Sequence, residues 1–236
     1  MKTAQMNDYD RPGTGAHRSR YGEIQSLDAT TEEFTLRKDR SFTFAIDALD
    51  EDETQQQLAA ASALARQQRY VVIPEVDTYT YGVMCEDAGF KPAAITLTKE
   101  NICTEIMKAN NKLDNAEVPE SNRQLVVTPD TYLLLKQCKD IVMETDIGND
   151  LRLKGVVATV DGANVIKVPA PRLPADFGFM LCHPTATVAP TKLESYKIHH
   201  NPPFINGDLV EGRIAYDAFV PSTRNQAIYY QALTNA

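Results

Sequence analysis

An acidic run followed by a long stretch of helix-forming residues is the feature that most restricts how this chain folds. Residues 47–53 (DALDEDE) carry five acids, and residues 54–69 consist mainly of Gln, Ala, Leu and Arg. Negative side chains stabilise a helix N-terminus because the helix dipole is positive there, and these residue types have high helix propensity. A narrow apolar stripe at helical spacing indicates one packed face; it comprises Leu58, Ala61, Ala65 and Val72.

The end of this helix has two interpretations at Pro74. Residues 70–73 (YVVI) resemble a short strand, because the residue before a proline is biased away from helical geometry. The following residues keep apolar side chains near helical spacing as far as Gly89, which instead indicates one long helix kinked at Pro74. Both interpretations remain open from the residues alone.

The rest of the chain alternates strand and helix signals and then becomes mostly β. Residues 32–47 predict strand, and a helix from Thr98 to about Leu113 has one apolar face. Residues 124–127 predict a buried strand, with a helix capped by Thr128 after it. A hairpin is expected about Asp161-Gly162 within residues 155–169, and residues from 177 onward predict mainly strands. This order predicts an α+β fold.

Composition argues against several classes of protein. The chain has 236 residues, 43% of them hydrophobic, and a formal charge of −8, which disfavours sequence-specific binding to nucleic acid. No apolar run is long enough to span a bilayer, so no membrane partner is expected. The cysteines are far apart and form no CxxC pair; we expect buried thiols in a reducing cytosol rather than a disulfide framework or a zinc site.

A glycine-rich and arginine-rich stretch, RPGTGAHRSRYG at residues 11–22, raises the question of a phosphate site. Such a loop binds phosphate when it leaves a buried strand and opens a helix. Neither flank has that character, and the third glycine of a dinucleotide fingerprint is missing. A basic hairpin tip is the better interpretation.

No catalytic, cofactor or metal site is expected. The histidines His17, His183, His199 and His200 form no known signature and are interpreted as surface residues. Acids at 47, 50 and 52 lack the glycine and distal glutamate of a calcium loop. A glycosidase-type carboxylate pair leaves no local signature, so an acidic α+β hydrolase remains a remote alternative.

Several unconnected segments, in order, resemble the major capsid proteins of tailed bacteriophages and prophages with the Hong Kong 97-like fold. The resemblance covers residues 6–230 and is carried by MNDYDRPGTGAHRSRYGE, DRSFTFAID, QQQLAAASALARQQRYVVIPEVDTY, VVTPDTYLLLK, GVVATVDGANVIKVP, HPTATVAPTKLESYK and HHNPPFINGDLVEGRIAYDAFV. It implies an extended loop, a long spine helix, a peripheral β-sheet and an α/β axial domain. It also favours the kinked helix over the strand at Pro74.

The resemblance implies four regions and three sets of structural residues. The regions are 1–40 (shortened N-terminus and extended loop), 41–94 (peripheral strand and spine helix), 95–190 (axial domain) and 191–236 (peripheral sheet). Subunit contacts are expected in the extended loop at Arg11, Gly13, Gly15, Arg18, Arg20 and Tyr21. The expected spine core is Leu58, Ala61, Leu64, Ala65, Val72 and Val76, and the expected peripheral loop is Pro202, Pro203, Asn206 and Gly207.

The function implied is that of a non-enzymatic subunit that assembles with itself, as pentamers and hexamers, into an icosahedral shell. Portal and scaffolding proteins and non-specifically packaged double-stranded DNA are the further partners expected, in the virion capsid and, during assembly, in the host cytoplasm. A nanocompartment shell subunit resembling encapsulins is the alternative. Members usually carry some tens of residues before the MNDYDR segment, so we expect a truncated or shortened homologue. No lysine lies between Lys2 and Lys38, so the family's lysine–asparagine cross-link is not expected.

Overall fold

The computed structural model describes residues 32–49, 59–138 and 159–234. Residues from Leu36 to Ala236 form one compact unit, the body, and Met1–Thr35 form a separate unit. The regular elements described here all belong to the body.

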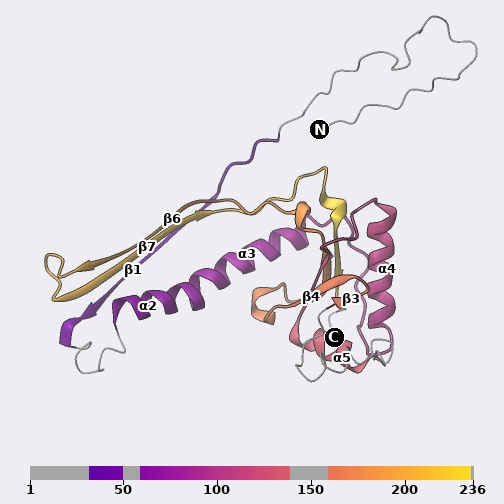
Figure 1. Cartoon of the computed structure of the whole chain (residues 1–236), viewed down its shortest axis with the longest axis horizontal. Helices are drawn as coiled ribbons and strands as arrows, with labels where there is room; N and C mark the ends of the chain where they lie inside the picture. Colours follow the sequence, from indigo (N-terminus) through magenta and orange to yellow (C-terminus); the bar gives the residue numbers. More distant parts are fainter. Residues whose placement is uncertain (1–31, 50–58, 139–158, 235–236) are drawn as a thin grey trace, which may run out of the picture. The chain divides into compact units, whose positions relative to one another are not determined.

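The body contains two β-sheets and several helices (Figure 1). The strands are β1 (Lys38–Asp47), β2 (Gln124–Val127), β3 (Thr159–Val160), β4 (Ala163–Lys167), β5 (Phe177–Cys182), β6 (Thr191–His200), β7 (Gly207–Tyr216) and β8 (Ile228–Ala232). The helices are α2 (Ala60–Gln67), the π-helical segment η1 (Gln68–Val72), α3 (Ile73–Glu86), α4 (Ile102–Asn115), α5 (Pro129–Gln137), and the 3-10 turns η3 (Ala170–Arg172), η4 (Pro184–Ala186) and η5 (Asn225–Ala227).

The first sheet has three antiparallel strands in the order β1-β7-β6, and α2 and α3 run along one of its faces (Figure 1). Alternating residues of the strands point to that face, because side chains alternate across a strand. Ile46 and Val210 are buried there against Ala60 of α2, with Leu64 partly buried beside them. Gly212 leaves room for the Phe42 ring, because a Cβ at position 212 would lie 2.4 Å from that ring. Glycine at this position therefore allows the ring to pack on the sheet.

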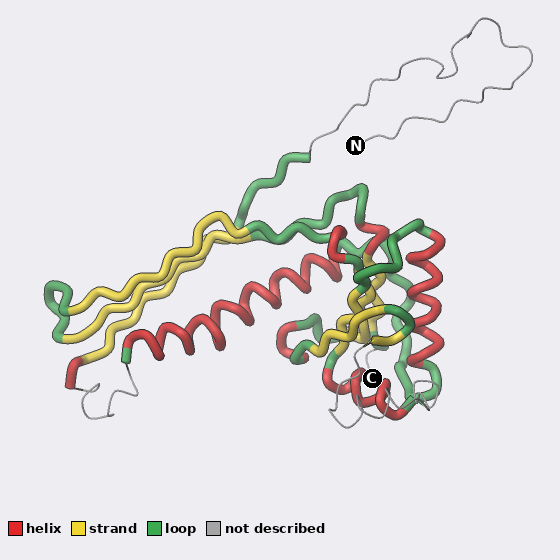
Figure 2. The backbone as a smooth tube through the Cα atoms, viewed as in Figure 1, coloured by secondary structure: helices red, strands yellow, loops and turns green. Residues whose placement is uncertain are grey.

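One unbroken helix runs from Ala60 to Glu86, which confirms the helical interpretation of residues 70–73 (Figure 2). Pro74 has no N–H to donate, and its ring would clash with the carbonyl four residues earlier in a regular α-helix. The chain instead widens into η1 just before it, where the N–H of Ile73 donates to the carbonyl of Gln68, five residues earlier. A π-helical turn, rather than a break, thus accommodates the proline.

The second sheet has five strands in the order β3-β4-β2-β5-β8, and only the pair β2–β4 is parallel. β5 is buried at all six positions because both faces of the sheet are covered. Phe179 and Leu181 pack on the side of α4 and α5, whereas Met180 and Cys182 pack on the side that also contains Met84 of α3. The single long helix therefore contributes to the cores of both sheets.

The last strand departs from the predicted grouping of residues 191–236 with the peripheral sheet. β8 pairs with β5 in the five-stranded sheet. Phe90 and Ile95 form parallel bridges with Tyr229 and Leu233, so these two residues also lie beside the C-terminal segment. These contacts join segments about 140 residues apart in the sequence, which local patterns do not reveal.

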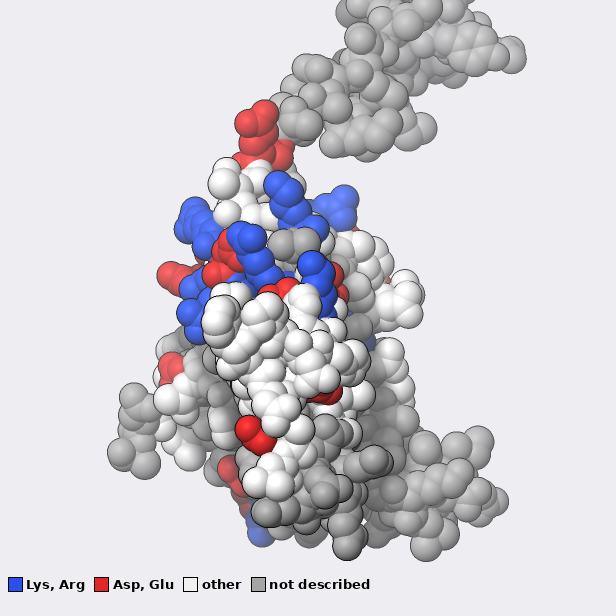
Figure 3. All heavy atoms as spheres, turned by 90° about the vertical axis from the view of Figure 1, so that its left-hand side faces the viewer, with Lys and Arg blue, Asp and Glu red and all other residues white. Residues whose placement is uncertain are grey.

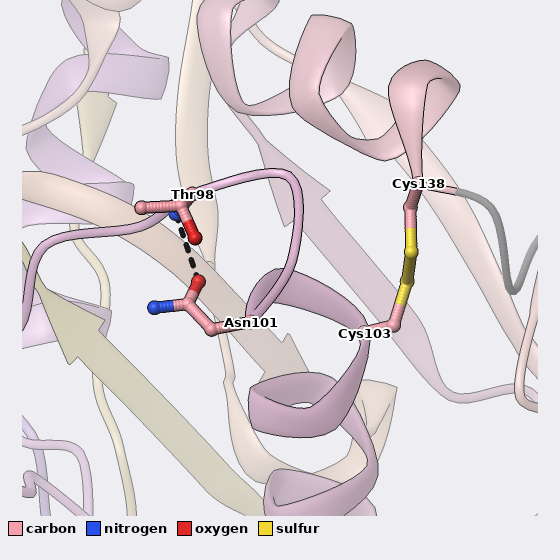
Figure 4. Close-up of a disulfide and its surroundings, with 4 residues drawn as sticks. All are labelled: Thr98, Asn101, Cys103 and Cys138. Carbon is pink, nitrogen blue, oxygen red and sulfur yellow. Dashed lines mark hydrogen bonds between the residues drawn. A yellow bond between two sulfur atoms is a disulfide. The ribbon is translucent and has the colours of Figure 1, made fainter.

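Local turn and cap signals are confirmed in the five-stranded part. Thr128 caps α5, its hydroxyl accepting from the N–H of Thr131 at 3.1 Å. The turn between β3 and β4 has positive φ at Asp161 (47°) and Gly162 (77°), as a two-residue hairpin requires. α4, however, begins at Ile102, because the Asn101 side chain accepts from the N–H of Thr98 at 2.8 Å and closes a turn ahead of the helix (Figure 4).

A disulfide joins Cys103 in the first turn of α4 to Cys138 at the end of α5, 35 residues later (Figure 4). The expectation of four free thiols is therefore wrong for this pair. Cys85 and Cys182 are free and buried, and burial raises the pKa of both thiols to about 12. Thiols that stay protonated at neutral pH are poor nucleophiles.

Candidate assembly surfaces

The turn between β6 and β7 presents an aromatic ring to solvent. Phe204 is as exposed as an isolated residue, at 107%, and its φ of 72° lies in the left-handed region. Asn201 has a φ of 47°, and its N–H donates to the carbonyl of Gly207 at 2.9 Å. Left-handed backbone at non-glycine residues is costly and persists where the surroundings impose it. The conformation of the turn is therefore imposed by the hairpin around it.

The same turn contains the predicted peripheral-loop residues, and β1 fixes it from the side. The N–H of Ala48, just after β1, donates to the carbonyl of Asn206 at 3.0 Å. A Cβ on Gly207 would lie 2.0 Å from the carbonyl oxygen of Ile46, so only glycine fits. Pro202 and Pro203 open the turn before Phe204. The structure therefore brings the four predicted residues together in one tip.

The outer face of the three-stranded sheet carries charges of both signs (Figure 3). Arg213 donates to both carboxylate oxygens of Asp39, at 2.9 and 2.6 Å. His199 lies 3.2 Å from Glu211 on the neighbouring strand. His200 faces the opposite side, 2.7 Å from Asp208, because successive side chains of a strand point to opposite faces. His183, expected at the surface, is instead buried and caps η4.

The spine helix leaves apolar side chains uncovered around η1. Tyr70 is 68% exposed and Ile73 is 49% exposed. Ala61 and Ala65, predicted in the spine core, are also exposed, and the face toward the sheet is formed by Ala60, Ala63 and Leu64 instead. This stretch of the helix is therefore a candidate interaction surface.

A groove of about 140 Å³ lies between this helix and the sheet. Val72 and Val76, predicted in the spine core, line it together with Gln67. At its edge Glu75 accepts from Arg40 at 2.7 Å and from the Tyr216 hydroxyl at 3.3 Å. Burial and the neighbouring Glu75 charge raise the pKa of Tyr216 to about 12.

Asp217, directly after β7, is a buried carboxylate with three donors. Its oxygens accept from the N–H of Arg37, the hydroxyl of Tyr79 and the N–H of Ala218, each at 2.8 Å. Burial alone would raise the pKa of Asp217, but the hydrogen bonds from Tyr79 and the two backbone N–H groups outweigh it and lower the pKa. The carboxylate is therefore held in its charged form.

An open hollow of about 590 Å³ lies between α4 and β8 on the five-stranded part. Its lining is mainly apolar, with Met107 exposed at 55%. The carboxylate in the lining, Glu105, is paired with Lys108 at 2.7 Å. This arrangement offers no carboxylate pair of the kind that a hydrolase would need.

Within the described residues no group of three or more His, Cys, Asp or Glu side chains is placed to hold a metal ion. In the same part of the chain no helix is both long enough and apolar enough to cross a bilayer. The surfaces described above contain exposed apolar groups, ion pairs and the turn with Phe204, which suit contacts with other protein chains.

The predicted extended-loop residues lie outside the described residues: Arg11, Gly13, Gly15, Arg18, Arg20 and Tyr21. Leu58 of the predicted spine core also lies outside them. Of the residues that sequence reasoning missed, Phe204 carried a signal, because an aromatic residue between Pro-Pro and Asn-Gly falls within a turn. Asp217 carried none, since its partners are up to 180 residues away.

Comparison with known proteins gives a result only at the level of structure. No protein-family model matches the chain, and no curated protein matches it in sequence. A capsid structure of cyanophage P-SCSP1u has a TM-score of 0.69 and 14% identity, over 91% of this chain and 81% of that one. A structure from Mycobacterium phage Che8 has a TM-score of 0.66 and 16% identity, over 82% and 70% of the two chains.

A mature capsid of bacteriophage PhiM1 is also similar, with a TM-score of 0.56 and 16% identity over 94% of this chain and 79% of that one. These likenesses extend over most of the chain. The expected fold class is confirmed: this chain has the Hong Kong 97-like fold of tailed-phage capsid proteins.

Proposed function

We propose that the chain is a major capsid protein of a tailed bacteriophage or prophage, a structural subunit that assembles with copies of itself into an icosahedral shell around double-stranded DNA. The observation that carries the proposal is the shared fold, which extends over 91% of this chain and 81% of a cyanophage capsid chain. That coverage leaves little of the chain for a separate catalytic domain.

The surfaces of the body support a role built on protein contacts. The turn with Phe204 and the exposed Tyr70 and Ile73 present apolar groups that the described residues leave largely uncovered. Aromatic residues are enriched at the centres of protein interfaces. In a shell, heterologous contacts between identical subunits close into rings, so each copy both offers and receives such groups.

The charge of the chain agrees with a container for DNA. A formal charge of −8 keeps most of the surface from binding the phosphate backbone tightly. Packaged DNA would then be held loosely and without sequence preference. This role involves other copies of the chain in pentamers and hexamers, a portal and a scaffold. The arginines at positions 11, 18 and 20 of the extended loop are the proposed contacts of each subunit with acidic groups of its neighbours.

Assembly of the purified chain tests the proposal. Size-exclusion chromatography with light scattering, followed by negative-stain microscopy, should show rings or closed shells. Each contact in such an assembly is expected to bury more than about 2,000 Å². A monodisperse monomer of 26.2 kDa at all concentrations, especially one that turns over a small substrate, would contradict it.

A cross-linked shell would require a lysine side chain at the tip of the extended loop. No lysine lies between Lys2 and Lys38, so boiled and reduced particles should run as a single band on a denaturing gel.

A further inference from the structure

The disulfide joins two helices on one side of the five-stranded sheet. Cys103 lies in the first turn of α4 and Cys138 directly follows α5, so the bond closes a loop that contains both helices and β2 (Figure 4). The two cysteines are 35 residues apart in the sequence. A bond that closes a loop of this length restricts the unfolded chain and thereby stabilises the folded one.

Both joined cysteines are buried in the core. Cys103 is 3% exposed and Cys138 is 2% exposed. They belong to the same buried cluster as Ile102, Leu135 and Phe179, which are fully buried. Thiol–disulfide exchange requires a thiolate to reach one of the two sulfur atoms. A small thiol therefore reaches this bond only when the α4–α5 side of the sheet opens.

Contacts other than the disulfide also hold α5 in place. The hydroxyl of Thr131 donates to the carbonyl of Gly178 in β5 at 2.9 Å. Leu135, one helical turn later, packs in the buried cluster. Because these contacts do not involve sulfur, they keep Cys138 close to Cys103 in the reduced chain as well. The two thiols are thus already positioned to be joined.

The other two cysteines provide an internal comparison. Cys85 and Cys182 belong to the cluster that includes Met84, on the opposite side of the same sheet, and both are free. Burial raises the pKa of both thiols, so they stay protonated at neutral pH and are poor nucleophiles. Exchange with a small disulfide is therefore expected at the α4–α5 pair and not at this one.

We propose that Cys103 and Cys138 form a redox-dependent lock: the reduced chain folds with the two thiols side by side, and oxidation then joins α4 to α5 through a bond that the folded core shields from small thiols. A small-molecule disulfide is the oxidant. One cysteine thiolate attacks it and releases a small thiol, and the second thiolate attacks the mixed disulfide and releases the other. Two electrons and two protons thus pass from the protein to the oxidant. The inference concerns the single subunit and does not rest on the proposed function.

The first test compares the oxidised and reduced forms of the full chain. The reduced form is prepared in urea with dithiothreitol and refolded, and part of it is then treated with oxidised glutathione. Thiols are alkylated after unfolding and located by peptide mass spectrometry. We expect both forms to have the same circular dichroism spectrum, the oxidised form to label only at Cys85 and Cys182, and its Tm to be higher by about 5–15 °C. In the control, Cys103→Ala combined with Cys138→Ala, the same treatments should leave Tm unchanged within about 1 °C.

The second test measures how fast dithiothreitol reduces the oxidised chain. Reduction should be at least tenfold slower in the folded chain than in urea, because it requires opening of the core. Leu135→Ala should accelerate reduction of the folded chain about tenfold or more, since Leu135 is fully buried in the cluster around the disulfide. Leu133→Ala is the matched control on the same helix, and because Leu133 is 54% exposed, the rate should stay within about twofold of wild type.

Four results would overturn the lock. They are a reduced chain that does not refold, no bond between Cys103 and Cys138 after oxidation, equal Tm values for the two forms, and equal reduction rates in the folded chain and in urea. Each is measured on unassembled subunits. A chain that locks as expected but never forms rings or shells would contradict only the proposed function.

Discussion

At the scale of single residues, two buried charged side chains each bind several groups from more than one segment of the chain. Asp217 does so at the end of the three-stranded sheet, and Arg123 does so in the five-stranded part. Arg123 is 3% exposed, and its guanidinium donates to Asn110 at 2.9 Å and to the carbonyls of Pro119 at 3.0 Å and Val118 at 2.6 Å. Asn110 in turn donates to Asp161 in the turn between β3 and β4.

Arg123→Met should lower the free energy of unfolding by about 2–4 kcal/mol, because it leaves buried acceptors without a donor. Urea unfolding followed by circular dichroism measures the change. Lys108→Met is the matched control: its ammonium group pairs with Glu105 at 2.7 Å on the exposed side of α4, so we expect a change within about 0.5 kcal/mol. Equal effects of the two substitutions would show that the Arg123 network does not stabilise the fold.

Acid should destabilise the body partly through Asp217. Its pKa is lowered below the ordinary value of 3.8 in the folded chain, so the carboxylate contributes stability that is fully present above about pH 4 and is lost as the pH falls through the folded-state pKa. Thermal melts between about pH 7 and pH 2.5 should therefore show a shallower acid decline in Asp217→Asn than in wild type. Parallel declines in the two proteins would rule out this contribution.

At the scale of elements, different residues of the long helix pack against different sheets. Leu64 is partly buried against Ile46, Ala60 and Val210, whereas its neighbour Ala65 is exposed. Leu64→Asp should cost about 2–4 kcal/mol, because it removes apolar contacts and places a carboxylate against the sheet. Ala65→Asp is the control and should stay within about 0.5 kcal/mol in the same urea experiment. Similar losses would mean that the helix is packed in a different rotation.

Elements with local signals were predictable, and contacts between distant elements were not. Thr128-Pro129 and Asp161-Gly162 determine their own cap and turn, so their predictions are confirmed. The position of β8 was missed because its pairing with β5 depends on contacts about 50 residues apart, and nothing in its apolar pattern selects one sheet over the other. The exposure of Ala61 and Ala65 was missed because alanine fits either face of a helix.

At the scale of the whole molecule, the residues that stabilise the fold differ from the exposed residues that we propose for contacts with other chains. Phe204 makes this separation testable, because its side chain is fully exposed in the single chain. Phe204→Ser should change the free energy of unfolding of the subunit by no more than about 0.5 kcal/mol. If the turn is an interface anchor, the same substitution should weaken assembly by about 2 kcal/mol or more per contact.

Light scattering during assembly, beside thermal melts of the unassembled subunit, measures both effects of Phe204→Ser. Leu133→Ser is the control, since Leu133 is also an exposed apolar residue, at 54%, but lies on α5 away from the hairpin. Normal assembly of Phe204→Ser would remove the hairpin tip from the proposed contacts and leave the exposed part of the spine helix and the extended-loop arginines as candidates.

The π-helical segment before Pro74 acts as a one-residue insertion in an otherwise regular helix. Because each residue of an α-helix turns the chain by about 100°, one extra residue rotates all later side chains by that angle. Leu64, before the segment, faces the three-stranded sheet, and Met84 and Cys85, after it, reach the core of the other sheet. Alignments with relatives that lack a proline at this position should therefore show a single-residue gap within residues 68–72.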